Sequence, residues 1–113
     1  MNLRGAAAED AAAQFLQRQG LRIVARNWSC RCGELDLIAR EGDTLVFIEV
    51  RQRTSNGYGG AAASIGATKR AKLTAAAQAY LQTLPVIPPC RFDAICMDGT
   101  KTEWLKNCID ASW

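Results

Sequence analysis

The sequence predicts an α/β domain built on one mixed β-sheet, and three observations carry this prediction. Two amphipathic helical patterns, at residues 3–19 and 67–84, lie on either side of three strand-like segments. Residues 33–53 form a hairpin of two apolar strands that carry carboxylates, joined by the turn residues 41–43. A further strand follows the second helix, and such a crossover requires a parallel pair of strands. The expected order is α-β-β-β-α-β, in one domain spanning residues 1–113.

Composition places the chain among ordinary globular domains. Hydrophobic residues make up 49% and charged residues 22%. No apolar run approaches the length of a membrane span. Arg4 is followed by Glu9 and Asp10 in an alanine-rich stretch, which is not the charged-then-apolar pattern of a signal peptide. We therefore expect a cytoplasmic protein with no membrane partner.

The first helix is expected to bury a stripe of small and apolar side chains at three- to four-residue spacing, and Gly20 ends it. The residues of this stripe are Ala8, Ala11, Ala12, Phe15 and Leu16. Residues 21–28 alternate as the first strand, and residues 29–33 form a turn that exposes Arg31.

Side chains in the hairpin should alternate between the two faces of the sheet. In its first strand, one face would hold Glu34, Asp36 and Ile38, and the other Leu35, Leu37 and Ala39. In its second strand, one face would hold Leu45, Phe47, Glu49 and Arg51, and the other Val46, Ile48 and Val50. Carboxylates set into apolar strands cost free energy unless a cation of the chain or a bound metal ion pairs with them.

After a glycine-rich loop at residues 54–63, either a lid or a simple connection, the second helix runs to Pro85. Its expected buried stripe is Leu73, Ala76, Ala77, Tyr80, Leu81 and Leu84. Lys69 lies one turn before Leu73 and should face the sheet, whereas Arg70 should face solvent.

The C-terminal part should contain a strand at residues 91–97, a turn at 98–99 and a final strand or tail at 102–109. Asp93 is expected to be the structural partner of an arginine, and Cys96 to belong to the core. Trp104 and Trp113 are expected to cover the edge with apolar surface.

The five cysteines, an odd number without a secretory signal, indicate reduced thiols and not a disulfide framework. Cys30 and Cys32 are one residue apart, which is not the spacing of a zinc knuckle. The chain has no histidine, so any chemistry must run on carboxylates, lysine, arginine or thiols.

The net charge of +3 is too small to indicate a nucleic-acid partner, but the distribution of charge is more informative. No acidic residue occurs from Val50 to Phe92, an interval with six basic residues: Arg51, Arg53, Lys69, Arg70, Lys72 and Arg91. A basic surface beside an acidic cluster suits a metal site that handles a phosphate backbone. The alternative is an ordinary solvated helix start.

Asp36 and Glu49, on neighbouring strands, could bind one Mg²⁺ through oxygen ligands, with the main-chain carbonyl of Val50 as a further ligand. Arg51, two residues after Glu49, returns to the same face and could contact a phosphate. Alternatively, Arg51 pairs with Glu34 or Asp36 and neutralises the cluster without metal. We favour the metal for Asp36 and Glu49, while for Glu34 and Glu9 both interpretations stay open.

The chain resembles the uncharacterised bacterial YraN family (UPF0102), which belongs with the Holliday-junction-resolvase-like and restriction-endonuclease-like nucleases. The resemblance covers nearly the whole chain. Its motifs are Glu9 with Ala12 and Leu16, Asn27, Gly33-Glu34-Leu35-Asp36-Leu37-Ile38, Phe47-Ile48-Glu49-Val50-Arg51, Arg53, Tyr58-Gly59, Lys69 and Arg91-Phe92-Asp93.

This resemblance implies a restriction-endonuclease-like core, a central mixed sheet flanked by helices. It also implies a D…ExK metal site for Mg²⁺ or Mn²⁺, which maps onto Asp36, Glu49 and position 51, with Glu9 as the acid of the first helix. Junction-resolving relatives work as dimers, so the resemblance leaves a homodimer open. One departure is that the nuclease pattern has lysine where this chain has Arg51. Arginine keeps the charge but cannot act as a general base, so Lys69 or a water molecule would have to move the proton.

Three hypotheses follow. The first is a Mg²⁺-dependent endonuclease acting on DNA, including branched or structured DNA, by phosphodiester hydrolysis. Its catalytic residues would be Glu9, Asp36, Glu49, Arg51 and Lys69, and its nucleic-acid-binding residues Arg53, Lys69, Arg70 and Lys72. The second is a nucleic-acid-binding module that keeps the fold without turnover. The third is a protein-interaction domain without a nucleic-acid role.

Overall fold

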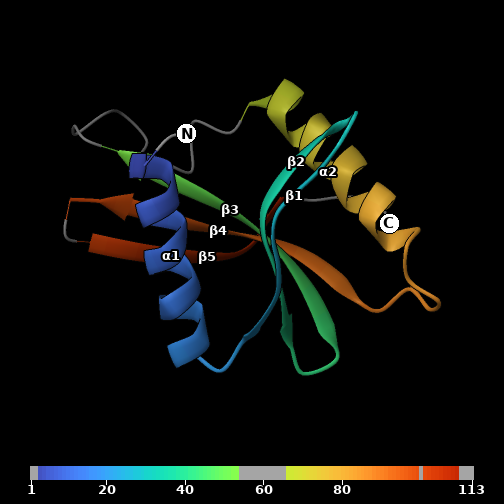
Figure 1. Ribbon diagram of the computed structural model, residues 1–113, viewed down its shortest axis with the longest axis horizontal. Helices are drawn as coiled ribbons and strands as arrows, with labels where there is room; N and C mark the ends of the chain where they lie inside the picture. Colours follow the sequence, from blue (N-terminus) through green and yellow to red (C-terminus); the bar gives the residue numbers. More distant parts are fainter. Residues whose placement is uncertain (1–2, 54–65, 100, 110–113) are drawn as a thin grey trace.

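A five-stranded mixed sheet with one helix on each face forms the molecule (Figure 1). The computed structural model describes residues 3–53, 66–99 and 101–109. The elements are α1 (Leu3–Arg18), β1 (Arg22–Cys30), β2 (Gly33–Glu41), β3 (Thr44–Arg53), α2 (Ala67–Leu81), β4 (Cys90–Asp98) and β5 (Lys101–Ile109). The strands lie in the order β1-β2-β3-β4-β5, with β3 and β4 parallel and the other pairs antiparallel. The predicted fold class is therefore confirmed, and the segment predicted as a strand or tail is the edge strand β5.

The end of α1 is set by Gly20, which has φ of +96°. The Gly20 amide donates to Gln17, and the Leu21 amide donates to the carbonyl of Leu16, each over 3.0 Å. These two bonds and the burial of Leu16 with Leu21 make up a Schellman motif. The predicted apolar stripe is correct except at Ala11, which is exposed, while Ala13 is buried.

The second helix ends earlier than predicted, at Leu81 instead of residue 84. Pro85 disfavours helical backbone at the residue before it. The amides of Thr83 and Leu84 accordingly bond three residues back, to Tyr80 and Leu81, and the Thr83 hydroxyl also donates to Tyr80. Residues 82–84 thus form a tightened turn after the helix.

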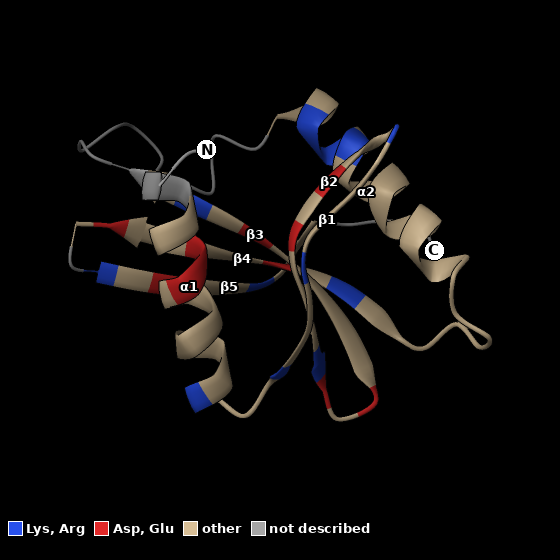
Figure 2. Ribbon diagram, viewed as in Figure 1, with Lys and Arg blue, Asp and Glu red and all other residues tan. Residues whose placement is uncertain are grey.

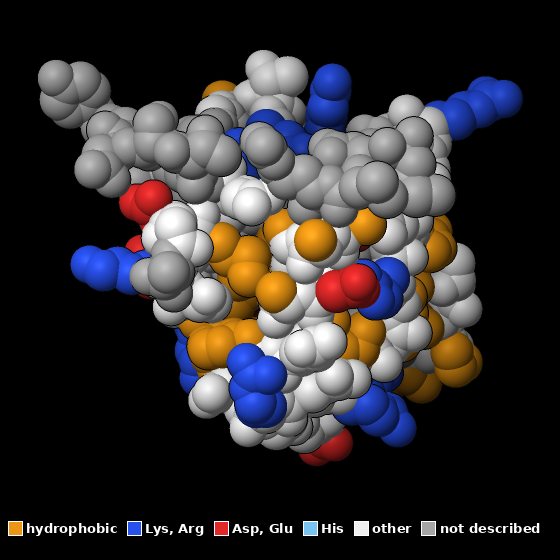
Figure 3. Space-filling model, turned by 60° about the vertical axis from the view of Figure 1, so that its left-hand side comes forward, with side chains coloured by type: hydrophobic (Ala, Val, Ile, Leu, Met, Phe, Trp, Pro, Cys, Tyr) orange, Lys and Arg blue, Asp and Glu red, His pale blue; other side chains and the backbone are white. Residues whose placement is uncertain are grey.

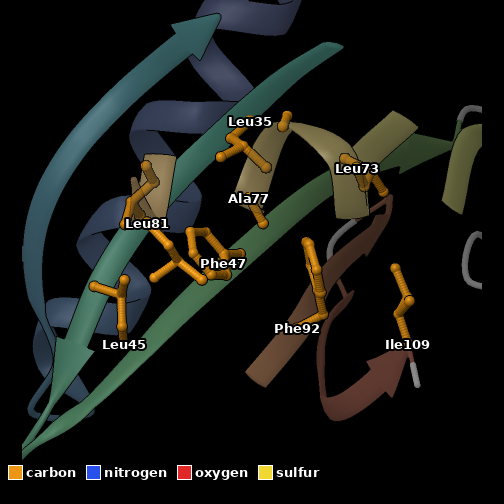
Figure 4. Packing of buried hydrophobic residues seen from close by; sticks show 10 residues of the cluster. Leu35, Leu45, Phe47, Leu73, Ala77, Leu81, Phe92 and Ile109 are labelled. Atoms are coloured by element: carbon orange, nitrogen blue, oxygen red, sulfur yellow. The ribbon is translucent and has the colours of Figure 1, made fainter. Parts of the chain in front are cut away.

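The core consists of two clusters, one on each face of the sheet. On one face α2 packs against the sheet (Figure 4), and the buried residues there are Leu35, Ile38, Leu45, Phe47, Leu73, Ala76, Ala77, Leu81, Phe92 and Ile109. On the other face α1 packs against the sheet, and the cluster is Ala12, Ala13, Leu16, Leu21, Leu37, Ala39, Val46, Ile48 and Ile95. Residues of β3 alternate between these clusters, so the sheet is covered on both sides.

Asp93 is fully buried in β4 and organises the edge of the sheet. Arg91 donates from Nε and Nη2, Trp104 donates from Nε1 over 2.9 Å, and the Asn107 amide donates over 2.8 Å. Asn107 has φ of 54°, and the register of β4 with β5 shifts beside Asp93. The predicted pairing of Asp93 with an arginine is confirmed. Trp104 does more than cover the edge, because it is also a hydrogen-bond donor.

The expectation that all five cysteines are reduced is wrong for two of them. Cys30 and Cys32 form a disulfide across the turn between β1 and β2. The turn brings their Cα atoms to 5.4 Å, a separation that a disulfide can span. Cys90, Cys96 and Cys108 are free, and Cys96 is buried in the core as predicted.

Some predictions lie outside the described residues, namely those on the loop at residues 54–63, including Tyr58 and Gly59, and on Trp113. Over the residues that are described, neither helix combines the length and the apolar character that crossing a membrane requires.

Candidate active site

The site lies where β2 separates from β3. Their pairing runs from Glu41 with Thr44 to Leu37 with Ile48 and extends no further. Beyond this point the β1–β2 hairpin bends away from β3 toward α2 (Figure 1). In the opening between the strands, Asp36 Oδ2 accepts a hydrogen bond of 2.9 Å from the Val50 amide. The carboxylate therefore replaces a backbone acceptor and is held beside Glu49.

The predicted alternation of β2 is wrong at Leu35. Leu37 and Ala39 lie on the α1 face and Ile38 on the α2 face, as alternation requires, but Leu35 also packs on the α2 face. The reason is a local twist of the hairpin, since Asn27, between the paired residues Arg26 and Trp28, has φ of 52°. This twist turns the start of β2, so that the Leu35 side chain packs on the α2 face of the sheet.

Glu49 comes from the middle of the sheet and is only 4% exposed. Its face of β3 is the predicted one, shared with Leu45 and Phe47 beneath α2. The pKa of Glu49 is raised to about 7, chiefly by burial and then by the nearby charge of Asp36, although Lys69 and Arg51 act in the opposite direction. The structure thus brings Asp36 and Glu49 together.

Two cations lie beside Glu49. Lys69 Nζ, from the first turn of α2, is 3.5 Å from Glu49 Oε1, and Arg51 Nη1 is 3.8 Å from the same oxygen. Lys69 therefore faces the sheet, the orientation expected from its spacing to Leu73. Pairing of a carboxylate with cations of the chain, the alternative to a metal ion, is present at Glu49.

The second carboxylate oxygen of Glu49 gives a test of whether a metal ion fits. Among the described residues, Oε2 is buried and has no hydrogen-bond partner. A buried carboxylate oxygen without a partner is costly, and an oxygen-liganded cation would satisfy it. Asp36, held next to Glu49 through the Val50 amide, supplies the second carboxylate. The donor set therefore fits a hard divalent cation such as Mg²⁺.

Glu9 approaches the site from α1. Burial raises its pKa, as do the charges of Asp36 and Glu34, whereas a hydrogen bond with the Asn27 side chain and the charge of Arg26 lower it. Asp36 thus acts on the pKa of both Glu9 and Glu49. Within the described part of the chain, no three histidine, cysteine or acidic side chains are arranged to hold a metal ion, so Glu9 does not complete a ready-made site.

Asn27 had no predicted role, although it anchors both the twist of the hairpin and the Glu9 side chain. The signal that could have found it is its residue type, because asparagine adopts positive φ more readily than most residues. An asparagine inside an otherwise alternating strand therefore indicates a break in the regular pleat.

The basic residues predicted to bind nucleic acid are distributed around α2. Figure 2 shows the basic first turns of α2 beside the acidic positions of β2. Lys72 is exposed and lies next to Gly33, while Arg70 borders a pocket with Thr74 and Ile109. The side chain of Arg53 lies outside what the structure describes. On the face seen in Figure 3, the charged side chains of the described residues stand mostly singly around hydrophobic ones.

A mixed sheet flanked by two helices, with carboxylates on adjacent central strands, defines the restriction-endonuclease-like class of folds. A profile of the family described as "Uncharacterised protein family UPF0102" matches residues 8–97. The chain is 51% identical to a UPF0102 protein of Janthinobacterium sp. (strain Marseille), over 96% of this chain and 89% of the relative. It is 54% identical to one of Cupriavidus metallidurans, over 95% and 81%, and 51% identical to one of Nitrosomonas europaea, over 96% and 95%. The chain belongs to the UPF0102 family.

Proposed function

We propose that this protein is a Mg²⁺- or Mn²⁺-dependent endonuclease that hydrolyses phosphodiester bonds of DNA. The observation that carries the proposal is the pair of half-buried Asp36 and buried Glu49, whose Oε2 oxygen has no hydrogen-bond partner among the described residues, flanked by Lys69 and Arg51. Two carboxylates that lie beside two cationic side chains suit a metal ion and a phosphate together. DNA as the substrate, and branched DNA in particular, comes from the family resemblance.

Asp36 and Glu49 would hold the metal ion. When bound, the ion would polarise the phosphate and lower the pKa of a water molecule. Arg51 stays charged at any working pH and therefore acts by gripping the phosphate, not by moving a proton. Lys69, 43% exposed at its side chain, can turn from Glu49 toward a phosphate. Proton transfer would then fall to Lys69 or to solvent water, and Glu9 would act through its charge at the margin of the site.

The test is cleavage of a panel of linear, nicked and four-way-junction DNA by the purified protein with Mg²⁺ or Mn²⁺. Asp36→Asn and Glu49→Gln should each reduce cleavage at least about 100-fold, since each removes a charged ligand. Asp43→Asn, at the exposed hairpin turn, is the matched control and should cleave as wild type does. Equal cleavage by wild type and Asp36→Asn would show that the activity is a contaminant.

A second candidate function is DNA binding without turnover, and one observation favours it. Arg51 stands where the nuclease pattern has lysine, and both Arg51 and Lys69 lie close to Glu49 Oε1, so the chain itself can neutralise this carboxylate. In this case DNA binding would weaken steeply with salt, survive Glu49→Gln, and be accompanied by no cleavage with either metal.

A further inference from the structure

The turn between β1 and β2 lies directly against the first turns of α2. A Cβ atom added to Gly33 would lie 2.8 Å from the Lys72 carbonyl oxygen and 3.4 Å from Lys72 Cβ. Any other residue at this position would push the turn away from the helix. Behind this contact, the Trp28 ring meets the edge of Tyr80 with 5.4 Å between the ring centroids. The turn and the helix therefore form one continuous surface.

Basic side chains from both elements lie on this surface. Arg31 is exposed in the turn, two residues before Gly33, and Lys72 is exposed on the other side of the contact. Lys69 lies one helical turn before Lys72 and reaches Glu49. The next acidic residue in the chain is Glu34, whose charge raises the pKa of Glu9. Glu34 therefore acts toward the acidic side of the candidate active site. The cations thus lead from the turn to the candidate active site.

Arg70 does not belong to this series. At about 100° per residue, the side chains of Arg70 and Lys72 leave the helix on nearly opposite sides. Arg70 accordingly borders the pocket with Thr74, Gln78 and Ile109, on the side of β5. The contact at Gly33 therefore selects one flank of α2, the flank of the β1–β2 hairpin.

We propose that the β1–β2 turn is a DNA-binding element, in which Arg31 extends the series of Lys72 and Lys69 and contacts a backbone phosphate next to the one at the site. This inference rests on the proposed function. Arginine is suited to the role because its planar guanidinium group can donate two parallel hydrogen bonds to one phosphate. Gly33 positions Arg31 by allowing the turn to rest on α2.

The experiment is a titration of fluorescent duplex DNA with the full chain at several salt concentrations, in EDTA so that no cleavage occurs. Arg31→Gln should weaken binding about 3- to 10-fold and lower the slope of log K against log salt by about one. Arg31→Lys should restore most of the slope. Gly33→Ala should weaken binding to a similar extent with all charges kept, in a protein whose circular dichroism spectrum is unchanged.

Arg18→Gln is the matched control, because Arg18 lies in the last turn of α1, at the opposite end of the molecule from the start of α2 (Figure 1). If Arg31→Gln binds as wild type does while Lys69→Gln and Lys72→Gln bind more weakly, the turn has no such role and DNA binding by the protein stands. If folded Gly33→Ala binds as wild type does, the contact with Lys72 does not position Arg31. If wild type itself does not bind DNA at low salt, both this inference and the proposed function are wrong.

Discussion

Glu49 combines features that are costly for folding but useful for binding a cation. It is nearly fully buried, one of its oxygens has no partner among the described residues, and its pKa is raised by burial and by Asp36. Below about pH 7 the protonated form of Glu49 is therefore favoured in the folded protein, despite the nearby Lys69 and Arg51. A carboxylate of this kind gains more from a metal ion than an exposed one would.

The first prediction concerns Glu49→Gln and pH. Because the folded pKa of about 7 lies above the ordinary value of 4.5, the folded state of wild type holds the extra proton between these values. The free energy of unfolding due to Glu49 is therefore largest below about pH 4.5, falls as the pH rises to about 7, and stays low above it. Glu49→Gln should remove this decline and be more stable than wild type at pH 8 by about 1–3 kcal/mol.

The measurement is urea unfolding of both proteins from pH 4 to pH 9 without divalent ions. Glu103→Gln, exposed on β5, should keep the pH profile of wild type. A parallel shift of the whole Glu49→Gln profile, with the decline intact, would assign the decline to other groups.

The second prediction concerns Asp93→Ala. This change removes a fully buried carboxylate, leaves the Trp104 indole and the Asn107 amide without their acceptor, and leaves Arg91 with Glu41 as its remaining carboxylate partner. We expect a loss of about 2–3 kcal/mol in the free energy of unfolding, because two hydrogen-bond donors lose their acceptor and Arg91 loses one of its two carboxylate partners. Asp98→Ala, at the exposed end of β4, should change stability by less than about 0.5 kcal/mol in the same denaturation experiment. Similar losses in both variants would contradict this role of Asp93.

At the scale of the elements, the ends of helices and strands position the site. The Schellman motif turns the chain from α1 into β1, and the early end of the β2–β3 pairing opens the space for Asp36. The crossover through α2 places Lys69 over the same end of β3. The end of the β2–β3 pairing and the start of α2 therefore meet at Glu49.

The third prediction tests the junction between α1 and β1. Gly20→Ala should lower the free energy of unfolding by about 1–2 kcal/mol, because Gly20 has φ of +96°, which an L-residue with a Cβ atom adopts only with strain. No atom of the described residues beyond the chain neighbours lies within 4 Å of the added Cβ, so the expected cost comes from the backbone. Thermal denaturation measures it, with the exposed Gln19→Ala as control, and an unchanged melting temperature for Gly20→Ala would contradict this account.

At the scale of the whole molecule, the candidate site draws residues from four elements. Glu9 comes from α1, Asp36 from β2, Glu49 from β3 and Lys69 from α2. A ligand bound between these residues would connect α1 and α2, on opposite faces, to the sheet. Its binding energy should therefore appear as stability of the whole fold.

The fourth prediction is that Mg²⁺ or Mn²⁺ stabilises the protein. At an ion concentration about 100-fold above its Kd, the free energy of unfolding should rise by about 2.7 kcal/mol. Asp36→Asn should abolish the increment, whereas Asp43→Asn should retain it. Urea denaturation with and without the ion gives the values. Equal increments in wild type and in Asp36→Asn would place the ion elsewhere on the protein.

Most elements and the fold class followed from local patterns. The helices and the hairpin strands have the periodicities of their elements, the crossover followed from the order of those elements, and the inward orientation of Lys69 follows from its spacing to Leu73. The errors occurred where a local rule met a constraint from elsewhere. Leu35 left the expected face because the hairpin twists at Asn27, and α2 stopped at Leu81 because of Pro85.

The sequence alone thus determined the α/β class, the strands that carry the carboxylates and the family of the protein. Only the tertiary structure decided that β2 parts from β3 at Asp36, that Cys30 pairs with Cys32, and that Gly33 rests on α2. The physical reason is that periodicity reports which face of an element is buried, whereas strand divergence and close backbone approach depend on how several elements pack at once.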